Sequence, residues 1–175
     1  MLGLRDRALL LIGFAGGFRR SELVGLTVEA LDFTDSGIRA HLTTSKTDQE
    51  GDGTTRLLRK GSTAPDPVDA LTAWLEASGI ESGPIFRSVN RHGGIGDKAM
   101  SDRAVSQVIK RRAEDAGLDA TNISGHSLRR GAATTARRNG ADPISIARGL
   151  GWADGSSVLN RYFETSIEDA PNLGL

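Results

Sequence analysis

The order of apolar and polar positions predicts helices at both ends of the chain and a short run of strands after the first two helices. Apolar side chains recur at helical spacing over residues 4–16, and Gly16-Gly17 ends this pattern. Ser21 is placed as the N-cap of a short second helix, SELVGL. From about Val28 to Leu58 the strand-like runs LDF, GIRAHLTT and TTRLLR predict a small antiparallel sheet. The polar stretch SKTDQEGDG between the last two runs is expected to be a hairpin loop.

The rest of the chain is again dominated by helical periodicity. Pro65 and Pro67 open a helix over DPVDALTAWLEAS, in which Trp74 is expected to be buried. Residues 79–100 contain several glycines and no steady period, so they are predicted to be mostly loop, with IFRS as a short extended piece. A helix from about Ser101 to Ala116 follows, with core positions at Ala104, Val105, Val108 and Ile109.

The last third predicts a helix that begins at His126, a short helix DPISIARGL, a turn at GWADGS and a final helix SSVLNRYFE. Nothing in the chain repeats. The pattern as a whole predicts a mostly helical α+β fold with a small antiparallel β-sheet near the N-terminal third. Residues 1–175 are expected to form one domain.

Composition narrows the class of protein. Aromatic residues make up only 5% of the chain, so Ala, Leu, Ile and Val must supply most of the core. Cysteine is absent, which excludes disulfides and thiolate metal sites and suits a reducing, cytoplasmic compartment. No apolar run approaches the roughly 20 residues of a membrane span, and no cleavage site of a signal peptide is found. Neither membrane association nor secretion is expected.

The distribution of charge matters more than its sum. The 22 basic and 22 acidic residues cancel, which by itself argues against a strongly basic nucleic-acid binder. Basic residues recur, however, in the short runs RDR, FRR, KRR, LRR and ARR, whereas acids gather in TDQEGDG and near the C-terminal end. A neutral chain of this kind can still present one basic face.

Residues able to handle a phosphate occur in four places. Arg19 lies in GFRRSELVGL, and His126 and Arg129 stand three residues apart in GHSLRR, a spacing that favours one side of a helix. Trp152 and Tyr162, the only tyrosine, lie in GLGWADGSSVLNRYFE. The fourth place is the predicted hairpin loop, which carries a lysine at position 46, Lys46.

This inventory fits phosphoryl transfer. Arginine forks donate to phosphate oxygens, a tyrosine oxygen can attack phosphorus, and a lysine can protonate a leaving alkoxide. No acidic cluster has the spacing of metal ligands, so we expect a mechanism without metal or cofactor. Each residue also has a plainer interpretation: solvated surface for the arginines and the lysine, a helix cap for the histidine, and core for the two aromatic residues.

The blocks GFRRSEL, a hairpin lysine, HSLR and LGW followed by a tyrosine, in this order, resemble the tyrosine recombinase (phage integrase) family. The resemblance covers essentially the whole chain and matches the catalytic domain of that family. The N-terminal core-binding domain, which clamps DNA, is expected to be absent from the chain. The resemblance implies a catalytic set and a supporting acid, Glu22. The catalytic set is Arg19, Lys46, His126, Arg129, Trp152 and Tyr162.

The chain departs from the family pattern in three respects. The interval from Trp152 to Tyr162 is one residue longer than usual, and the extra residue is placed in the turn ADGSS. Most members have histidine where this chain has Trp152. Tryptophan keeps an N–H donor at this position but has no acid–base role. Lys60 stands near the other end of the same sheet and is an alternative to Lys46.

The resemblance implies a site-specific recombinase that cuts and rejoins DNA through a 3′-phosphotyrosyl intermediate, without ATP or metal. The implied partner is double-stranded DNA, with no small-molecule substrate, and the implied location is nucleoid-associated. A tetramer is expected on DNA and a monomer when the chain is isolated. Two alternatives stay open: a type IB topoisomerase-like enzyme that relaxes DNA, and an integrase relic that binds DNA without cutting it.

Overall fold

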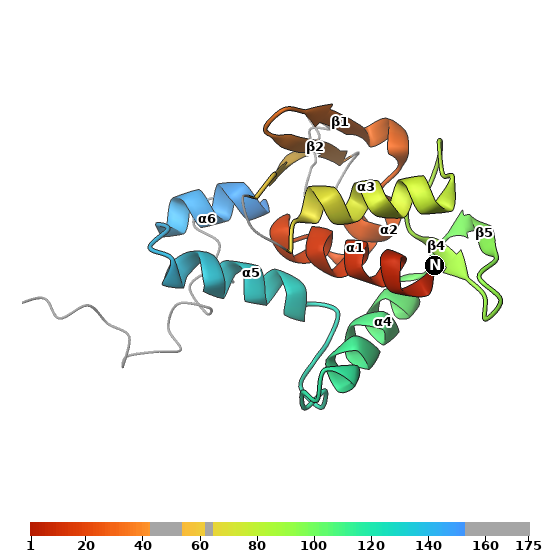
Figure 1. Cartoon of the computed structure of the whole chain (residues 1–175). Coiled ribbons are helices and arrows are strands. Elements are labelled where there is room, and N and C mark those ends of the chain that lie inside the picture. The colour runs from red at the N-terminus through yellow and green to blue at the C-terminus, as the bar shows by residue number, and fades with distance from the viewer. Residues whose placement is uncertain (43–53, 62–64, 153–175) are drawn as a thin grey trace, which may run out of the picture.

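The computed structural model describes residues 1–42, 54–61 and 65–152 (Figure 1). Lys46, Tyr162 and the predicted final helix lie outside the described residues. Helix α1 (Leu2–Ala15) runs through the centre of the molecule and lies alongside α3 (Pro67–Ser78). The predicted mostly helical α+β fold with a small antiparallel sheet is confirmed.

Helix α3 begins and ends where the sequence predicts. The Asp66 carboxylate caps it by accepting hydrogen bonds from the amides of Val68 and Asp69, at 2.7 and 2.9 Å. Gly79, in the left-handed region, ends it. Trp74 is fully buried, and its indole N–H donates to the Ile85 carbonyl at 3.0 Å. The expected core position of Trp74 is therefore confirmed.

The first sheet is a three-stranded antiparallel meander of β1 (Leu31–Thr34), β2 (Gly37–Leu42) and β3 (Thr54–Arg59). In the β2–β3 ladder Leu42 pairs with Thr54 and Gly37 pairs with Arg59. Residues 43–53, which lie outside the described residues, therefore connect the two strands at the Leu42–Thr54 end of the sheet. The short helix η1 (Val28–Ala30) leads into β1.

Residues 79–100 are more ordered than the sequence predicts. They contain β4 (Arg87–Val89) and β5 (Ile95–Ala99), which pair as a second antiparallel sheet. The Asn90 side chain holds the intervening turn by accepting hydrogen bonds from the amides of His92 and Gly94, each at 2.9 Å. These strands are short and contain no fully buried residue, so they lack the alternation that identifies a strand from sequence.

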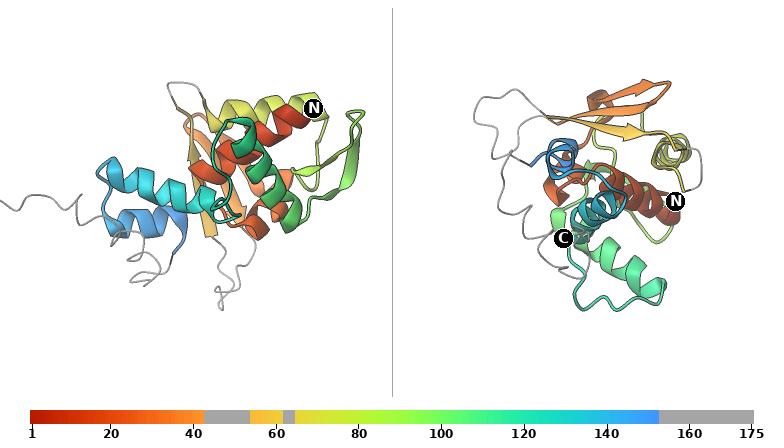
Figure 2. Two further views of the ribbon diagram at one scale, coloured as in Figure 1. Left: turned by 90° about the horizontal axis from the view of Figure 1, so that it is seen from below. Right: turned by 90° about the vertical axis from the view of Figure 1, so that its left-hand side faces the viewer.

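The last three helices pack in two different places: α4 against the main core, and α5 and α6 against each other. Helix α4 (Asp102–Asp115) buries Val105, Val108 and Ile109 as predicted, whereas Ala104 is only half-buried. Helices α5 (Ser127–Arg138) and α6 (Pro143–Leu150) pack together and project to one side of α1, as the left view of Figure 2 shows. Their shared core is small and built from alanine, isoleucine and leucine: Ala132, Ala133, Ile146, Ala147 and Leu150.

Two of the basic runs are used inside the fold. Asp6 of α1 is only 1% exposed and accepts hydrogen bonds from Arg5, Arg111 and Arg112 at 2.6 to 2.9 Å. This ion-pair cluster ties α1 to α4. Arginines of the runs RDR and KRR therefore pair with a buried carboxylate, so these runs do not contribute all of their charge to a basic face.

Candidate active site

Arg129 joins the ends of two helices to a third. It lies in the first turn of α5, is 5% exposed, and donates from Nη1 to the Gly17 carbonyl at 2.5 Å. Its Nη2 donates to the Gly151 carbonyl at 3.2 Å. Gly17 follows α1 and Gly151 follows α6, so one guanidinium fixes both helix ends relative to α5.

Both carbonyls are presented by glycines in the left-handed region. The φ angles of Gly17 and Gly151 are +55° and +65°, which cost a side-chain-bearing residue strain but glycine almost nothing. Close packing reinforces the requirement at Gly17, where an added Cβ would lie 2.5 Å from Cδ2 of Leu150. The glycine pair of the sequence thus ends α1 and also aims a carbonyl at Arg129.

Trp152 covers the other side of the same guanidinium. Cζ of Arg129 lies 4.1 Å from the centroid of the Trp152 ring, which is cation–π geometry and worth about 0.5–1 kcal/mol. The half-buried ring also packs against the α5–α6 core, and the Trp152 amide donates to the Ala147 carbonyl at 2.8 Å. The structure brings Arg129 and Trp152 together, as the sequence predicts.

Arg19 stands at the start of α2 (Arg20–Gly25) with its direction set by Glu22. The Arg19 amide donates to Oε2 of Glu22 at 2.7 Å, and its Nη1 lies 2.5 Å from Oε1. Arg19, and not Ser21, is therefore the N-cap, because Glu22 satisfies the first free amide from within the helix. The Arg19 side chain is 33% exposed and that of Glu22 only 8%. The fork is fixed rather than free.

His126 has a different environment from Arg129. It is exposed at the N-cap of α5 and lines a hollow of about 470 Å³ with Arg20 and Lys110. Arg129 is buried and donates to the Gly17 and Gly151 carbonyls, whereas His126 is exposed at the point where residues 121–125 lead into α5. The two side chains, three residues apart in sequence, therefore differ in exposure.

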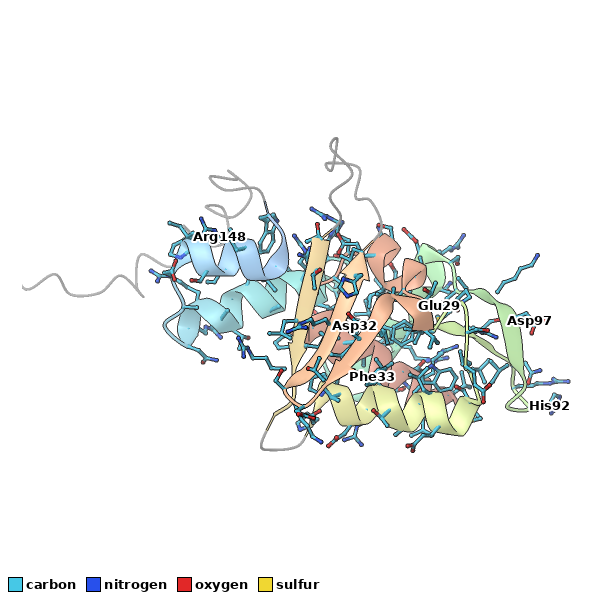
Figure 3. The ribbon with its side chains drawn as sticks, turned by 90° about the horizontal axis from the view of Figure 1, so that it is seen from above. Glu29, Asp32, Phe33, His92, Asp97 and Arg148 are labelled. Atoms are coloured by element: carbon cyan, nitrogen blue, oxygen red, sulfur yellow. The ribbon has the colours of Figure 1, made fainter. Side chains whose placement is uncertain are left out.

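The sheet register separates the two candidate lysines. Lys60 follows the far end of β3, and its Nζ lies 3.7 Å from Oδ1 of Asp69 on α3. Lys46 lies outside the described residues, in the loop that joins the Leu42–Thr54 end. Helix α6, which leads to Trp152, contacts β3 and lies beside it in Figure 3.

The sequence analysis does not identify Arg56 as a residue of the site, although this arginine on β3 is almost fully buried. A Cβ on Gly151 would overlap its guanidinium, so Arg56 lies directly against the residue that holds Arg129. The missed signal was alternation along TTRLLR. It places Arg56 on the same face as buried Leu58, where an apolar residue is expected.

The sequence profile of the phage integrase family matches this chain over residues 1–168. The chain belongs to this family. An integrase/recombinase XerD homologue of Selenomonas ruminantium is 42% identical over 163 residues, which cover 93% of this chain and 48% of the relative. The chain, residues 1–175, thus spans about half the length of that relative.

Solved structures agree in fold. The crystal structure of XerA recombinase matches 94% of this chain and 54% of its own, with a TM-score of 0.70 and 21% identity. The XerH site-specific recombinase bound to its palindromic difH substrate, in a post-cleavage complex, matches 91% of this chain and 41% of its own. Its TM-score is 0.67 and its identity 20%. These likenesses establish the fold of a phage integrase.

Within the residues that the structure describes, no helix is long and apolar enough to cross a membrane. Within the same residues, no three His, Cys, Asp or Glu side chains gather in a way that could hold a metal ion.

Proposed function

We propose that this chain cuts and rejoins double-stranded DNA as the catalytic part of a site-specific recombinase. The observation that carries the proposal is the guanidinium of Arg129, held by the Gly17 and Gly151 carbonyls beneath Trp152. Arg19 follows Gly17 by two residues and is fixed by Glu22. Two oriented arginines next to one another in the fold are suited to the non-bridging oxygens of a phosphodiester.

The chemistry divides among the catalytic set. Arg19, Arg129 and the indole N–H of Trp152 stabilise the charge of the pentavalent phosphorus. The phenolic oxygen of Tyr162 forms the new P–O bond, and the bond to the 5′ oxygen breaks.

The family resemblance implies proton-transfer roles for the remaining two residues. Lys46 gives its proton to the departing 5′ oxygen, and His126 exchanges protons with the phenol and donates to the phosphate. Attack of a second 5′-hydroxyl on the phosphotyrosine reverses both steps and restores a phosphodiester, so no ATP is consumed. The cationic side chains stabilise the charge that a metal ion would otherwise stabilise.

The choice of Lys46 over Lys60 rests on the sheet. Arg56 and α6 lie toward the Leu42–Thr54 end of β3, the end that the loop carrying Lys46 joins. Lys60 is at the opposite end and is engaged with Asp69. We therefore assign the proton-donating role to Lys46, because Lys60 would have to give up its ion pair with Asp69.

The partners follow from the reaction. Exchange of strands between two duplexes requires several protomers, so we expect a tetramer on DNA and a monomer without it. The match covers 48% of the Selenomonas ruminantium relative, and we propose that residues 1–175 form a single catalytic domain. Because the proposed substrate is DNA, we expect the protein to associate with the nucleoid. The relatives named above are recombinases, so the topoisomerase and relic alternatives gain no support from them.

Covalent trapping tests the proposal. The chain is incubated with nicked duplexes in EDTA, the reaction is stopped with SDS, and the Tyr162→Phe variant is run alongside. We expect a protein–DNA adduct with the parent chain and none with the variant. Relaxation of supercoiled plasmid without joining of two sites would support the topoisomerase alternative. An adduct of equal yield in the variant would contradict the proposal.

A further inference from the structure

Arg56 occupies a position that the fold normally reserves for an apolar side chain. It pairs with Ala40 across the β2–β3 ladder, and buried Leu58 follows it on the same face of the sheet. Its exposed fraction is only 2%. A charged side chain in such a place costs free energy unless neighbouring groups compensate it.

The compensation around Arg56 is incomplete. Its Nε and Nη1 are buried and have no hydrogen-bond partner in the part of the chain that the structure describes. Burial lowers the pKa of Arg56, the Glu22 carboxylate raises it, and the Arg19 guanidinium lowers it again. A methionine would fill much of the same volume without stranding two N–H donors.

Arg56 lies beside groups that hold the two arginines of the candidate site. Its guanidinium lies against Gly151, whose carbonyl accepts from Arg129. It also lies within electrostatic range of Glu22, which fixes Arg19. Arg56 is thus placed next to the supports of both Arg19 and Arg129.

We propose that Arg56 is a positioning residue of the phosphate site, a buried cation that orients Arg19 through Glu22 and Arg129 through Gly151. This inference rests on the proposed function. Its positive charge steadies the Glu22 carboxylate, and its bulk fixes the Gly151 backbone. The arriving phosphodiester supplies the negative charge that the three arginines share.

Three variants of the full chain separate this role from a merely structural one. Arg56→Met removes the charge and keeps much of the volume, and Arg56→Lys keeps the charge but loses the planar fork. Arg59→Met, on the same strand, removes an exposed arginine and is the matched control. Each is compared with the parent chain for melting temperature, for the rise in melting temperature caused by a nicked duplex, and for the rate of adduct formation.

We expect Arg56→Met to melt at or above the temperature of the parent chain without DNA, because it removes an unpaired buried charge. The same variant should lose most of the DNA-induced rise and form the adduct ten- to a hundredfold more slowly, as expected for a misplaced reacting group. Arg56→Lys should recover part of that rate. Arg59→Met should resemble the parent chain in all three measurements.

Two results would overturn the inference. One is a clear fall in the melting temperature of Arg56→Met without DNA, which would make Arg56 an ordinary structural residue. The other is an unchanged adduct rate and DNA response in that variant. If the parent chain itself neither responds to DNA nor forms an adduct, the proposed function fails. In that case the melting temperatures without DNA still decide whether Arg56 is structural.

Discussion

The guanidinium of Arg129 is enclosed by the ring of Trp152, 4.1 Å from Cζ to the ring centroid, and by the carbonyls that end α1 and α6. The arginine is therefore part of the fold as well as of the candidate site. Its orientation is set before any substrate arrives, which is the condition under which a donor stabilises a transition state most strongly.

Replacement of Arg129 is expected to abolish cleavage. Loss of one oriented donor typically costs about 3 kcal/mol in the barrier, so Arg129→Ala should slow adduct formation by a hundredfold or more. Arg130→Ala, which removes the exposed arginine next in sequence, is the control and should stay within about threefold of the parent chain. Quenched time courses measure both rates. A rate for Arg129→Ala within threefold of the parent would contradict its assignment.

Replacement of Trp152 by phenylalanine separates packing from donation. Phenylalanine keeps a ring for the cation–π contact but has no N–H, so the free energy of unfolding should change by only about 1 kcal/mol. Adduct formation should nevertheless slow at least tenfold, since the phosphate loses a donor. Urea unfolding and the trapping assay give the two quantities. Equal adduct rates in the variant and the parent chain would limit Trp152 to packing.

Gly151 is expected to tolerate no side chain. Gly151→Ala places a Cβ against the Arg56 guanidinium and forces alanine to the left-handed φ of +65°. We expect a loss of about 1–3 kcal/mol in the free energy of unfolding. Gly149→Ala is the matched control, because a Cβ there meets nothing within 4 Å and alanine favours a helix. Equal stability of the two variants in urea would contradict this account of Gly151.

The Asp6 cluster is expected to govern acid stability. Burial by itself would raise the pKa of Asp6, but hydrogen bonds from Arg5 and Arg112 outweigh it and lower the pKa below the ordinary value. The stabilisation is therefore complete above about pH 4, the unfolded-state pKa, and is lost as the pH falls through the folded-state pKa.

Asp6→Asn tests this cluster. It leaves Arg5 buried without its anion, so the free energy of unfolding at neutral pH should fall by about 3–5 kcal/mol. The acid-dependent loss below about pH 4 should be smaller in this variant. Asp115→Asn removes only the exposed partner of Arg112 and should cost less than about 1 kcal/mol. Urea unfolding at several pH values checks both; an equal effect of the two substitutions would contradict the central role of Asp6.

The sequence predicts well those features that local pattern controls. Helices α1, α3, α4, α5 and α6 and the three strands of the first sheet follow from apolar spacing and from glycine and proline signals. The neighbourhood of Arg129 and Trp152 was predicted from the order of the motifs, which reflects a family's shared fold. Position along the chain was enough in these cases.

Features that depend on contacts distant in sequence were missed. The pair β4 and β5 is stabilised by a turn at Asn90 and by packing, not by alternation. Arg111 and Arg112 reach Asp6 from 105 and 106 residues away in the sequence, which no local pattern reveals. Arg56 looked like one more basic residue, because its burial depends on α6 packing against β3.

The most direct test of the account is to map the bond that the chain forms with DNA. The trapped adduct is digested with protease and nuclease, and the modified peptide is sequenced by mass spectrometry. We predict a nucleotide joined through its 3′ phosphate to Tyr162, formed in EDTA. A 5′ linkage, attachment at another residue, or cleavage that leaves no protein on the DNA would contradict a tyrosine recombinase mechanism for this chain.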